Sequence, residues 1–499
     1  MSVEQKITAS QACHIDGRAG YFRFRQAQLQ GLYNLVSKNR DAFVAALRSD
    51  TQKNEFEAVL EVNLVLKQLR AGFEATAFDV LTARAKEQYL SGTVEAPQGT
   101  VLIVGHWTAP LDSVLGPLCA AITAGNVAVA VLPAPAMSTY ELLIQLSPRQ
   151  YDVEAYPVLL GTEAVINKAL SFRFNSYYGT VTDHGLRQQL VTAATRADAT
   201  IKVLPSATNI RKHNIAIVNK TIPESQLVQV AREVCRASFG CVGGQGLGHV
   251  SVVLVHGERH DAFSREMVRA TRHLFPSSGR HAGMRDLCPL NVTETEISTL
   301  GAAVKEGNLV CGGEWDAATG WFAPTILENV NVKSSLLATP LAGPILPLVP
   351  FHSTEEAIRI AQDITGHNLA VFGTQKDKNY FTVALCPSRA TTGCVLGDLV
   401  GLAPGPDNDR YPASLFTTIT VLSEADASIK DLFPPYSAWQ ISLLDKILLP
   451  KSPKELKAKR PMHQSSVGRN FFLQGAMLSV VIIVSLLGAA GLVAYMFLK

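Results

Sequence analysis

Residues 99–105 read GTVLIVG, residues 111–124 read LDSVLGPLCAAITA, and residues 126–132 read NVAVAVL. The first and third segments are short, branched and almost continuously apolar, which is typical of strands buried in a parallel sheet. The segment between them has the length and composition of a helix. A strand, a helix and a strand at this spacing predict a βαβ unit with a right-handed crossover, so the predicted fold class is α/β.

The sequence on both sides of this unit extends the same pattern. Residues 22–47 and 54–90 carry apolar side chains at helical spacing and predict amphipathic helices. Short apolar runs at residues 345–349 and 370–372 predict further strands. The alternation of helices and strands is therefore expected through most of the chain.

The composition narrows the class of protein. The chain has 499 residues, enough for about three domains, and a formal net charge of only +3. This balance argues against a nucleic-acid-binding surface, which needs a clustered excess of basic side chains. None of the eight cysteines has the spacing of a redox or zinc motif, and the polar start MSVEQKITAS lacks the apolar stretch of a secretory signal. We therefore expect reduced thiols in the cytosol and no metal site.

Residues 471–498 contain no charged side chain. A hydrocarbon core about 30 Å thick needs roughly 20 helical residues, so this segment is long enough to cross a membrane. Basic residues precede it and should stay on the cytosolic side: Lys446, Lys451, Lys454, Lys457, Lys459, Arg460 and Arg469. The sequence predicts a single-pass C-terminal anchor in the endoplasmic reticulum or another organelle membrane, with the body facing the cytosol. A buried core helix is the alternative, which the all-round apolarity disfavours.

Several long segments resemble one family. They are GRAGYFRFRQAQLQGLYNLV from Gly17, DTQKNEFEAVLEV from Asp50, VLIVGHWTAPLDSVLGPLCAAITAGN from Val101, GGEWDAATGWFAPTIL from Gly312 and AGPILPLV from Ala342. From about residue 17 to residue 399 the chain resembles class 3 aldehyde dehydrogenases, including the membrane-tethered fatty aldehyde dehydrogenases. The resemblance implies a Rossmann-like NAD domain, an α/β catalytic domain and a small β segment used in oligomerisation.

On this resemblance the chain divides into four parts. Residues 1–210 are expected to form the ancestral NAD-binding domain with N-terminal helices, and residues 211–400 the ancestral catalytic domain. Residues 401–470 are a degenerate C-terminal segment and basic linker, and residues 471–498 are the anchor. The implied partners are the bilayer, a lipophilic small molecule, and a second copy or an active relative in a homodimer or heterodimer.

The positions that the resemblance assigns to catalysis hold other residues. The family's reaction needs a nucleophilic thiolate, an oxyanion hole and a glutamate base. The thiolate of the G-Q-x-C motif falls on Leu247, and the oxyanion asparagine falls on Thr108. The glutamate of E-L-G-G-K falls within KVLPSATN, residues 202–209, which has no acid. A leucine cannot act as a nucleophile, so loss of the family's oxidation is expected.

The cofactor positions are also changed. The K-P-S-E motif is replaced by LPAP at residues 132–135, and the glutamate of E-x-F-G-P becomes Pro340. The F-T-G-S-x-x-V-G turn reads YYGTVTDH at residues 177–184, where Asp183 would bring negative charge to a phosphate site. G-V-x-x-N-D reads GCVLGD at residues 393–398. NAD(P) is therefore implied by the resemblance alone, and no residue is predicted to contact it.

A few residues could supply other chemistry. Cys241 is the candidate replacement nucleophile, although a small packed residue in a glycine-rich turn is the favoured interpretation. His249 could act beside such a thiol as an acid or base, but a structural or solvent-facing role is favoured for it, as for His184 and His213. Cys235 follows helical spacing and should be a core residue. The run at residues 211–213, RKH, could bind an anion, although a solvated loop is favoured.

The sequence thus predicts a membrane-anchored aldehyde dehydrogenase-like pseudoenzyme, or a pocket reused for a lipophilic substrate. One alternative is an active oxidoreductase that converts hydrophobic aldehydes to acids. The other is a non-catalytic partner or scaffold of an active relative.

Overall fold

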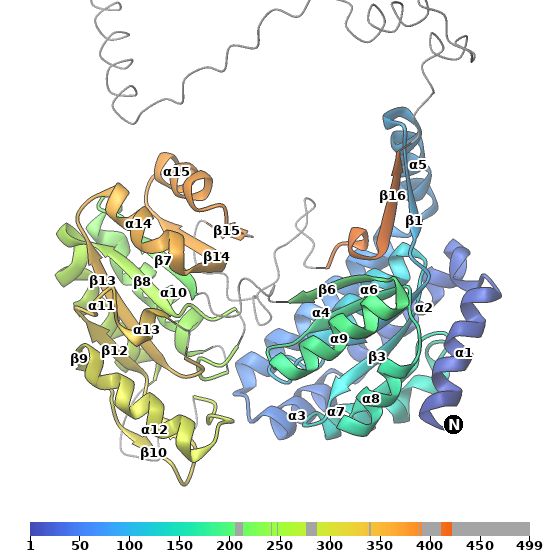
Figure 1. Ribbon diagram of the computed structural model, residues 1–499, viewed down its shortest axis with the longest axis horizontal. Helices are drawn as coiled ribbons and strands as arrows, with labels where there is room; N and C mark the ends of the chain where they lie inside the picture. Colours follow the sequence, from blue (N-terminus) through green and yellow to red (C-terminus); the bar gives the residue numbers. More distant parts are fainter. Residues whose placement is uncertain are drawn as a thin grey trace, which may run out of the picture. The chain divides into compact units, whose positions relative to one another are not determined.

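The computed structural model describes residues 1–204, 213–240, 242–246, 248–275, 287–338, 341–387, 389–391 and 411–421. Two large sheets with helices on both faces organise this part of the chain (Figure 1). Both sheets belong to one unit of the chain, Met1–Leu422. The α/β class expected from the GTVLIVG and NVAVAVL segments is confirmed.

The first sheet consists of five parallel strands in the order β4-β3-β2-β5-β6. They are β2 (Thr100–Val104), β3 (Val127–Pro133), β4 (Val158–Gly161), β5 (Ser176–Thr180) and β6 (Thr200–Leu204). Every side chain of β2 is buried, as its apolar sequence predicts. The strand order reverses between β2 and β5, and α/β sheets bind ligands at the carboxyl ends of the strands beside such a reversal.

Helices cover both faces of the first sheet. One face packs against α1 (Val3–Ile15), α8 (Glu163–Ser171) and α9 (His184–Ala197). The other packs against α2 (Phe22–Lys38), α3 (Arg40–Thr51), α4 (Glu55–Ala75), α6 (Asp112–Ala124) and α7 (Met137–Leu146). Because side chains alternate along a strand, Val101 and Ile103 enter one core while Leu102 and Val104 enter the other.

The second sheet has seven strands in the order β15-β14-β7-β8-β13-β12-β9, and only β9 runs antiparallel to its neighbour. They are β7 (His213–Val218), β8 (Val252–His256), β9 (Asn308–Cys311), β12 (Thr325–Glu328), β13 (Ile345–Phe351), β14 (Thr365–Phe372) and β15 (Arg389–Thr391). The predicted strands at residues 345–349 and 370–372 are confirmed as parts of β13 and β14.

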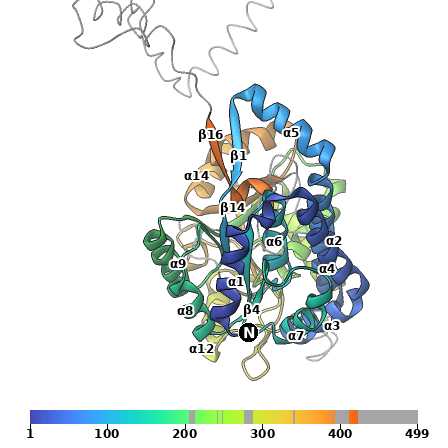
Figure 2. The same ribbon diagram turned by 90° about the vertical axis from the view of Figure 1, so that its right-hand side faces the viewer.

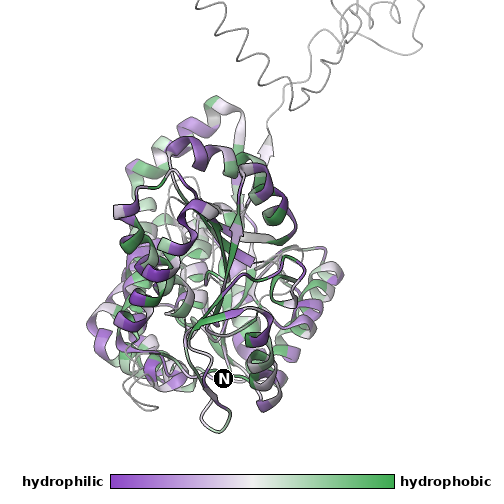
Figure 3. Cartoon of the chain, turned by 90° about the vertical axis from the view of Figure 1, so that its left-hand side faces the viewer, coloured by the Kyte–Doolittle hydropathy of each residue, from purple (hydrophilic) through white to green (hydrophobic). Residues whose placement is uncertain are grey.

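The second sheet is also covered on both faces. Helices α10 (Leu227–Phe239) and α11 (Gly257–Leu274) pack on one face. The other face carries α12 (Glu294–Ala303), α13 (Ser335–Ala338), α14 (Thr354–Ile364) and α15 (Gln375–Leu385). A small hairpin joins β10 (Trp315–Asp316) to β11 (Trp321–Phe322). In Figure 3 the strands are largely hydrophobic, while the helices alternate between hydrophobic and hydrophilic colours.

The last described segment returns to the first core. Strand β16 (Thr417–Val421) pairs with β1 (Thr93–Pro97) as an antiparallel ribbon beside α5 (Phe78–Ser91) (Figures 1 and 2). Tyr411 is buried, and its hydroxyl donates to Asp112 at 3.1 Å. A Cβ atom on Gly116 would lie 2.2 Å from the Tyr411 ring, so α6 needs a glycine there. Residues 411–421 therefore complete a core that the sequence assigned to the N-terminal half.

Two further predictions can be compared with the structure. The helix predicted over residues 22–47 is two helices, because Asn39 leaves the helical conformation (φ −117°, ψ 26°) between α2 and α3. Among the described helices, none has both the length and the apolar character needed to cross a bilayer. The predicted anchor at residues 471–498 lies outside the described residues.

Candidate functional site

The reversal of strand order between β2 and β5 brings together His106, Thr108 and Thr182. Thr108 is the predicted site residue among them. Thr108, at the expected oxyanion position, is buried after β2. Its hydroxyl lies 2.7 Å from Nδ1 of His106, and its backbone N–H donates to the same nitrogen at 3.3 Å. Nε2 of His106 lies 3.2 Å from the Thr182 hydroxyl beyond β5. The Thr108 hydroxyl is therefore engaged with a neighbouring ring.

The hydrogen bonds fix the form of His106. A backbone N–H can only donate, so Nδ1 must accept and Nε2 must carry the proton that faces Thr182. Burial, with a smaller contribution from the nearby Lys53 charge, lowers the pKa of His106 to about 4. The ring is thus neutral at physiological pH, with both of its nitrogens hydrogen-bonded.

The amino end of α9 is occupied by its own side chain. Asp183 is the N-cap, and its carboxylate accepts from the Leu186 backbone N–H at 2.6 Å. A helix amino terminus attracts anions because its N–H groups are free and its dipole is positive there. Here the capping carboxylate uses one of those donors and repels a phosphate group.

The carboxyl end of β3 gives no cofactor contact either. Leu132 is buried, Pro133 ends the strand, and Ala134 and Pro135 are exposed, so no charged or amide side chain is available in the described segment. Helices α8 and α9 lie side by side (Figures 1 and 2) and border an open groove. Arg196 in this groove already donates to the Leu170 carbonyl. The described residues therefore do not fit the phosphate and ribose groups of NAD(P).

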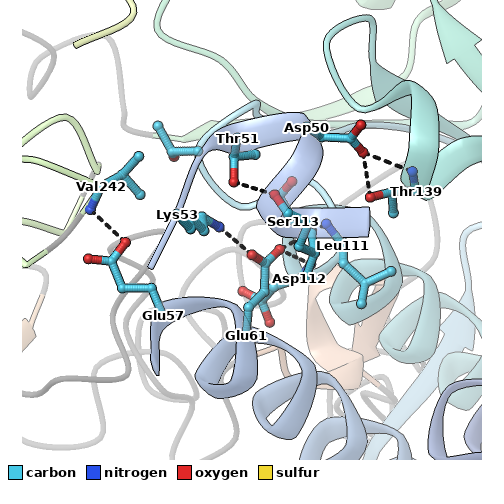
Figure 4. A network of polar contacts seen from close by, with 12 residues as sticks. Asp50, Thr51, Lys53, Glu57, Glu61, Leu111, Asp112, Ser113, Thr139 and Val242 are labelled. Atoms are coloured by element: carbon cyan, nitrogen blue, oxygen red, sulfur yellow. Dashed lines mark hydrogen bonds and ion pairs between the residues drawn. The ribbon is translucent and has the colours of Figure 1, made fainter. Parts of the chain in front are cut away.

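A buried ion pair lies between α4 and the start of α6 (Figure 4). The side chains of Lys53 and Glu61 are fully buried and pair with each other. The other carboxylate oxygen of Glu61 accepts from the backbone N–H groups of Leu111 at 2.9 Å and Asp112 at 3.1 Å. One carboxylate thus neutralises a buried ammonium and also satisfies free donors at a helix start.

Glu57, on α4, contacts the described loop at residues 242–246, which precedes the expected nucleophile position in sequence. Its Oε2 accepts from the Val242 backbone N–H at 3.2 Å, and Asn54 donates to its Oε1 at 3.3 Å. Figure 4 shows the Glu57–Val242 contact beside the Lys53–Glu61 pair. Burial raises the pKa of Glu57 to about 8, although Lys53 and the Val242 N–H oppose the shift. This carboxyl group is largely protonated at neutral pH.

The loop at residues 242–246 is held by its backbone and by one glutamine. Gly243 and Gly244 have positive φ angles of 63° and 76°, and a Cβ atom on Gly244 would lie 2.5 Å from the Gly343 carbonyl oxygen. The Gln245 amide donates to the Val242 and Pro289 carbonyls and accepts from the Asn291 N–H. Its role is structural. The candidate nucleophile Cys241 and the replaced position Leu247 lie outside the described residues.

The remaining residues named in the sequence analysis lie in different parts of the fold or outside the described residues. Cys235 is buried in the second core, where burial raises its pKa to about 12, as expected for a core thiol. His184 is an exposed first residue of α9, and His213 is buried at the start of β7. Pro340, residues 205–212 and residues 393–398 are outside the described part. No group of three or more His, Cys, Asp or Glu side chains in that part could hold a metal ion.

Sequence reasoning missed Lys53, Glu57 and Glu61. A signal existed, because Glu57 and Glu61 are four residues apart and share a helix face with Ala58, Val62 and Val65, which are buried. Two acids on an apolar stripe indicate a buried polar network.

Comparisons with known proteins agree with this fold. The sequence model described as "Aldehyde dehydrogenase family" matches residues 2–384. Aldehyde dehydrogenase family 3 member B1 of Bos taurus is 26% identical over 357 residues, which cover 69% of this chain and 72% of that protein. Family 3 member A2 of Pongo abelii is 26% identical over 371 residues, covering 72% and 73%.

Solved structures are similar in fold. The substrate-bound AldH of Staphylococcus aureus superposes with a TM-score of 0.71 at 18% identity, covering 90% of this chain and 100% of that one. The indole-3-acetaldehyde dehydrogenase AldA of P. syringae, solved with NAD+, gives 0.68 at 17% identity, covering 84% and 88%. With the family match over more than half its length, this chain belongs to the aldehyde dehydrogenase family.

Proposed function

We propose that this aldehyde dehydrogenase family member no longer carries out NAD(P)-linked aldehyde oxidation and keeps its pocket for a lipophilic molecule at a membrane. The observation that carries the proposal is the Asp183 carboxylate at the start of α9, where a cofactor phosphate would need free N–H donors. The Thr108 hydroxyl supports it, because it is engaged with His106. Residues 132–135, which end β3 without a charged side chain, support it further.

The lipophilic ligand and the membrane follow from other features. The most similar relatives reported above include family 3 members, and residues 471–498 have the length and apolarity of an anchor. A membrane-held protein meets its ligands in or near the bilayer, so a hydrophobic ligand is the class that fits.

Calorimetry of NAD(H) and NADP(H) with the full chain in detergent tests the proposal. We expect no binding at millimolar cofactor. Micromolar binding together with oxidation of long-chain aldehydes would establish the active oxidoreductase instead. Asp183→Asn is the matched variant, because asparagine caps a helix as well as aspartate but carries no charge. Binding that appears only in this variant would identify the carboxylate as the main barrier.

The non-catalytic alternative rests on the β1–β16 ribbon. Val94 and Ile419 on this ribbon are 41% and 60% exposed, so the ribbon offers apolar surface to a second chain. Co-purification with an active relative, lost on Ile419→Lys, would favour a partner role.

The membrane anchor has its own test. Carbonate washing of membranes should release a chain that ends at residue 470 but leave the full chain in the membrane.

A further inference from the structure

The amino ends of the strands β7, β8 and β14 hold a group of polar side chains in the second sheet. His213 begins β7, Ser251 immediately precedes β8, and Asn368 lies in an irregular part of β14 where the register with β7 shifts. Bulges of this kind re-aim side chains and are common next to sites. The group is separate from the His106 region of the first sheet.

Hydrogen bonds join these residues into one cluster. Nδ1 of His213 lies 2.9 Å from the Ser251 hydroxyl, and the Ser251 backbone N–H donates to the Asn214 carbonyl at 2.9 Å. The Asn214 side chain donates to the His249 carbonyl at 3.1 Å and accepts from the Asn368 backbone N–H at 3.1 Å. The cluster therefore contains two imidazoles and one uncommitted amide.

Four buried polar atoms of this cluster have no hydrogen-bond partner among the described residues. They are Nε2 of His213, Nε2 of His249, and both Nδ2 and Oδ1 of Asn368. His213 is only 1% exposed. Buried polar atoms are almost always paired, because an unsatisfied one costs about 1 to 3 kcal/mol. Several at one place indicate that a group other than the described residues satisfies them.

The imidazoles are neutral. Burial lowers the pKa of His213 to about 4, with a smaller contribution from His249, while a backbone contact with Leu337 opposes the shift. Burial also lowers the pKa of His249. Nδ1 of His249 faces the Gly246 carbonyl at 2.6 Å, so it carries the proton and leaves Nε2 as a bare acceptor. The contacts described above run to neutral groups. Among the described residues, such a site offers acceptors and an amide, but no positive charge for a carboxylate.

We infer that this cluster binds the neutral head group of a lipophilic molecule, an alcohol or a primary amide, through Nε2 of His249, Nε2 of His213 and the Asn368 amide. The hydroxyl or amide N–H donates to an imidazole nitrogen, and the head-group oxygen accepts from Asn368. The inference rests on the proposed function for its lipophilic tail, and it adds the chemistry of the head. The inference also excludes a fatty acid as the ligand, because its carboxylate would lose its water at this site without gaining a counter-charge.

Water-soluble probes test the assignment on the full chain in detergent. Hexanamide, 1-hexanol and hexanoate share one alkyl length and differ only at the head. Calorimetry should show binding of hexanamide, hexanol or both, and weaker or no binding of hexanoate. Binding of one neutral probe alone would identify the head-group class. Binding of hexanoate alone would overturn the neutral head group, and binding of no probe would leave the buried atoms to water and overturn the site.

Substitutions test the location. His213→Ala, His249→Ala and Asn368→Ala should each weaken binding of the neutral probe about fivefold to tenfold, the equivalent of one hydrogen bond. His260→Ala is the matched control, because Nε2 of His260 is also buried without a partner among the described residues but lies on α11, outside the cluster. Equal binding in all four variants would overturn the location.

A measurement on the unmodified chain keeps the test valid where a variant fails to fold. In 15N-histidine-labelled protein, the Nε2 resonances of two histidines should shift when the neutral probe is added, and absence of any shift would overturn the inference. The cofactor titration remains separate. Binding of both NAD(H) and the neutral probe would overturn the proposed function and leave the head-group site. Binding of neither would overturn the head-group site and leave the loss of the cofactor.

Discussion

The carboxyl end of the first sheet and the amino end of the second sheet each bury histidine, but they treat its hydrogen-bonding capacity differently. In the first region both ring nitrogens of His106 have partners, Thr108 and Thr182. In the second region Nε2 of His213 and Nε2 of His249 have none among the described residues. The first region satisfies its buried imidazole internally, and the second leaves imidazole acceptors for a ligand.

The difference indicates where binding capacity remains in this chain. A ligand can only gain from hydrogen-bonding groups that the protein does not already use. At the first region His106 engages the Thr108 hydroxyl, and the Asp183 carboxylate engages one backbone donor at the start of α9. The buried imidazole at the end of the first sheet is therefore committed to its neighbours, while the second sheet holds buried imidazole nitrogens that a ligand could use.

The largest expected effect concerns the ion pair that supports the first region. Lys53→Met should lower the free energy of unfolding by about 3 to 5 kcal/mol, because it leaves the Glu61 carboxylate buried without its counter-charge. Urea unfolding followed by circular dichroism measures the change. Arg70→Ala is the control, since its pair with Glu74 is exposed and should contribute nothing measurable. A Lys53 variant as stable as wild type would show that the pair is not needed.

The second prediction concerns Glu57, which links α4 to the loop before His249. Its pKa is about 8 in the folded chain, against 4.5 as the ordinary value. Folding therefore favours the protonated form, and this stability is fully present below pH 4.5 and lost as the pH rises to about 8. Glu57→Gln does not titrate, so it should be more stable than wild type at pH 8, by about 4 kcal/mol, and similar at pH 4.

Urea midpoints at the two pH values check this sign. The groups facing Glu57 are Lys53, Glu61 and Cys288, and Cys288 should remain a thiol throughout because burial raises its pKa to about 12. Glu61→Gln is the contrasting variant, because it removes the carboxylate that is paired with Lys53. It should lower the stability of the folded chain at both pH values. A Glu57 variant that is less stable at pH 8 would mean that the carboxyl is ionised in the folded chain.

The third prediction addresses the second region. Ser251→Ala removes the hydroxyl that contacts Nδ1 of His213, and among the described residues the ring then keeps only its contact with the Leu337 backbone. The expected loss is about 1 to 2 kcal/mol of unfolding free energy, measured by urea unfolding without a probe. Hexanamide should recover part of this loss if the head group occupies the cluster. Identical stability with and without the probe would contradict that assignment.

The sequence predicted the two strands β2 and β3 of the first sheet well because they are almost wholly apolar. β2 and β3 lie where GTVLIVG and NVAVAVL placed them, and the helix between them starts one residue later than expected. The break at Asn39 was missed because apolar spacing continues through it. The return of residues 411–421 to the first core could not be predicted, since it depends on contacts far apart in sequence, such as Gln68 with Tyr411.

The site was predicted less completely. The resemblance located Thr108 and Asp183, but only the folded structure shows that Thr108 contacts His106 and that Asp183 caps α9. His213 and His249 were singled out and given structural roles. Their free nitrogens depend on which atoms surround them after folding, which no spacing rule encodes.

The smallest expected effect is the matched change in the first region. Thr108→Val keeps the side-chain shape but removes the hydroxyl beside Nδ1 of His106, and the Thr108 backbone N–H still donates to that nitrogen. Because the acceptor stays paired, the loss should be only about 0.5 kcal/mol, well below that of Ser251→Ala. Equal losses in the two variants, measured side by side by urea unfolding, would remove the distinction between the committed His106 and the open His213.

A change of activity at the same position is not expected. Thr108→Asn restores the family's residue but should give no aldehyde oxidation, because a single oxyanion donor cannot replace a nucleophile and a base.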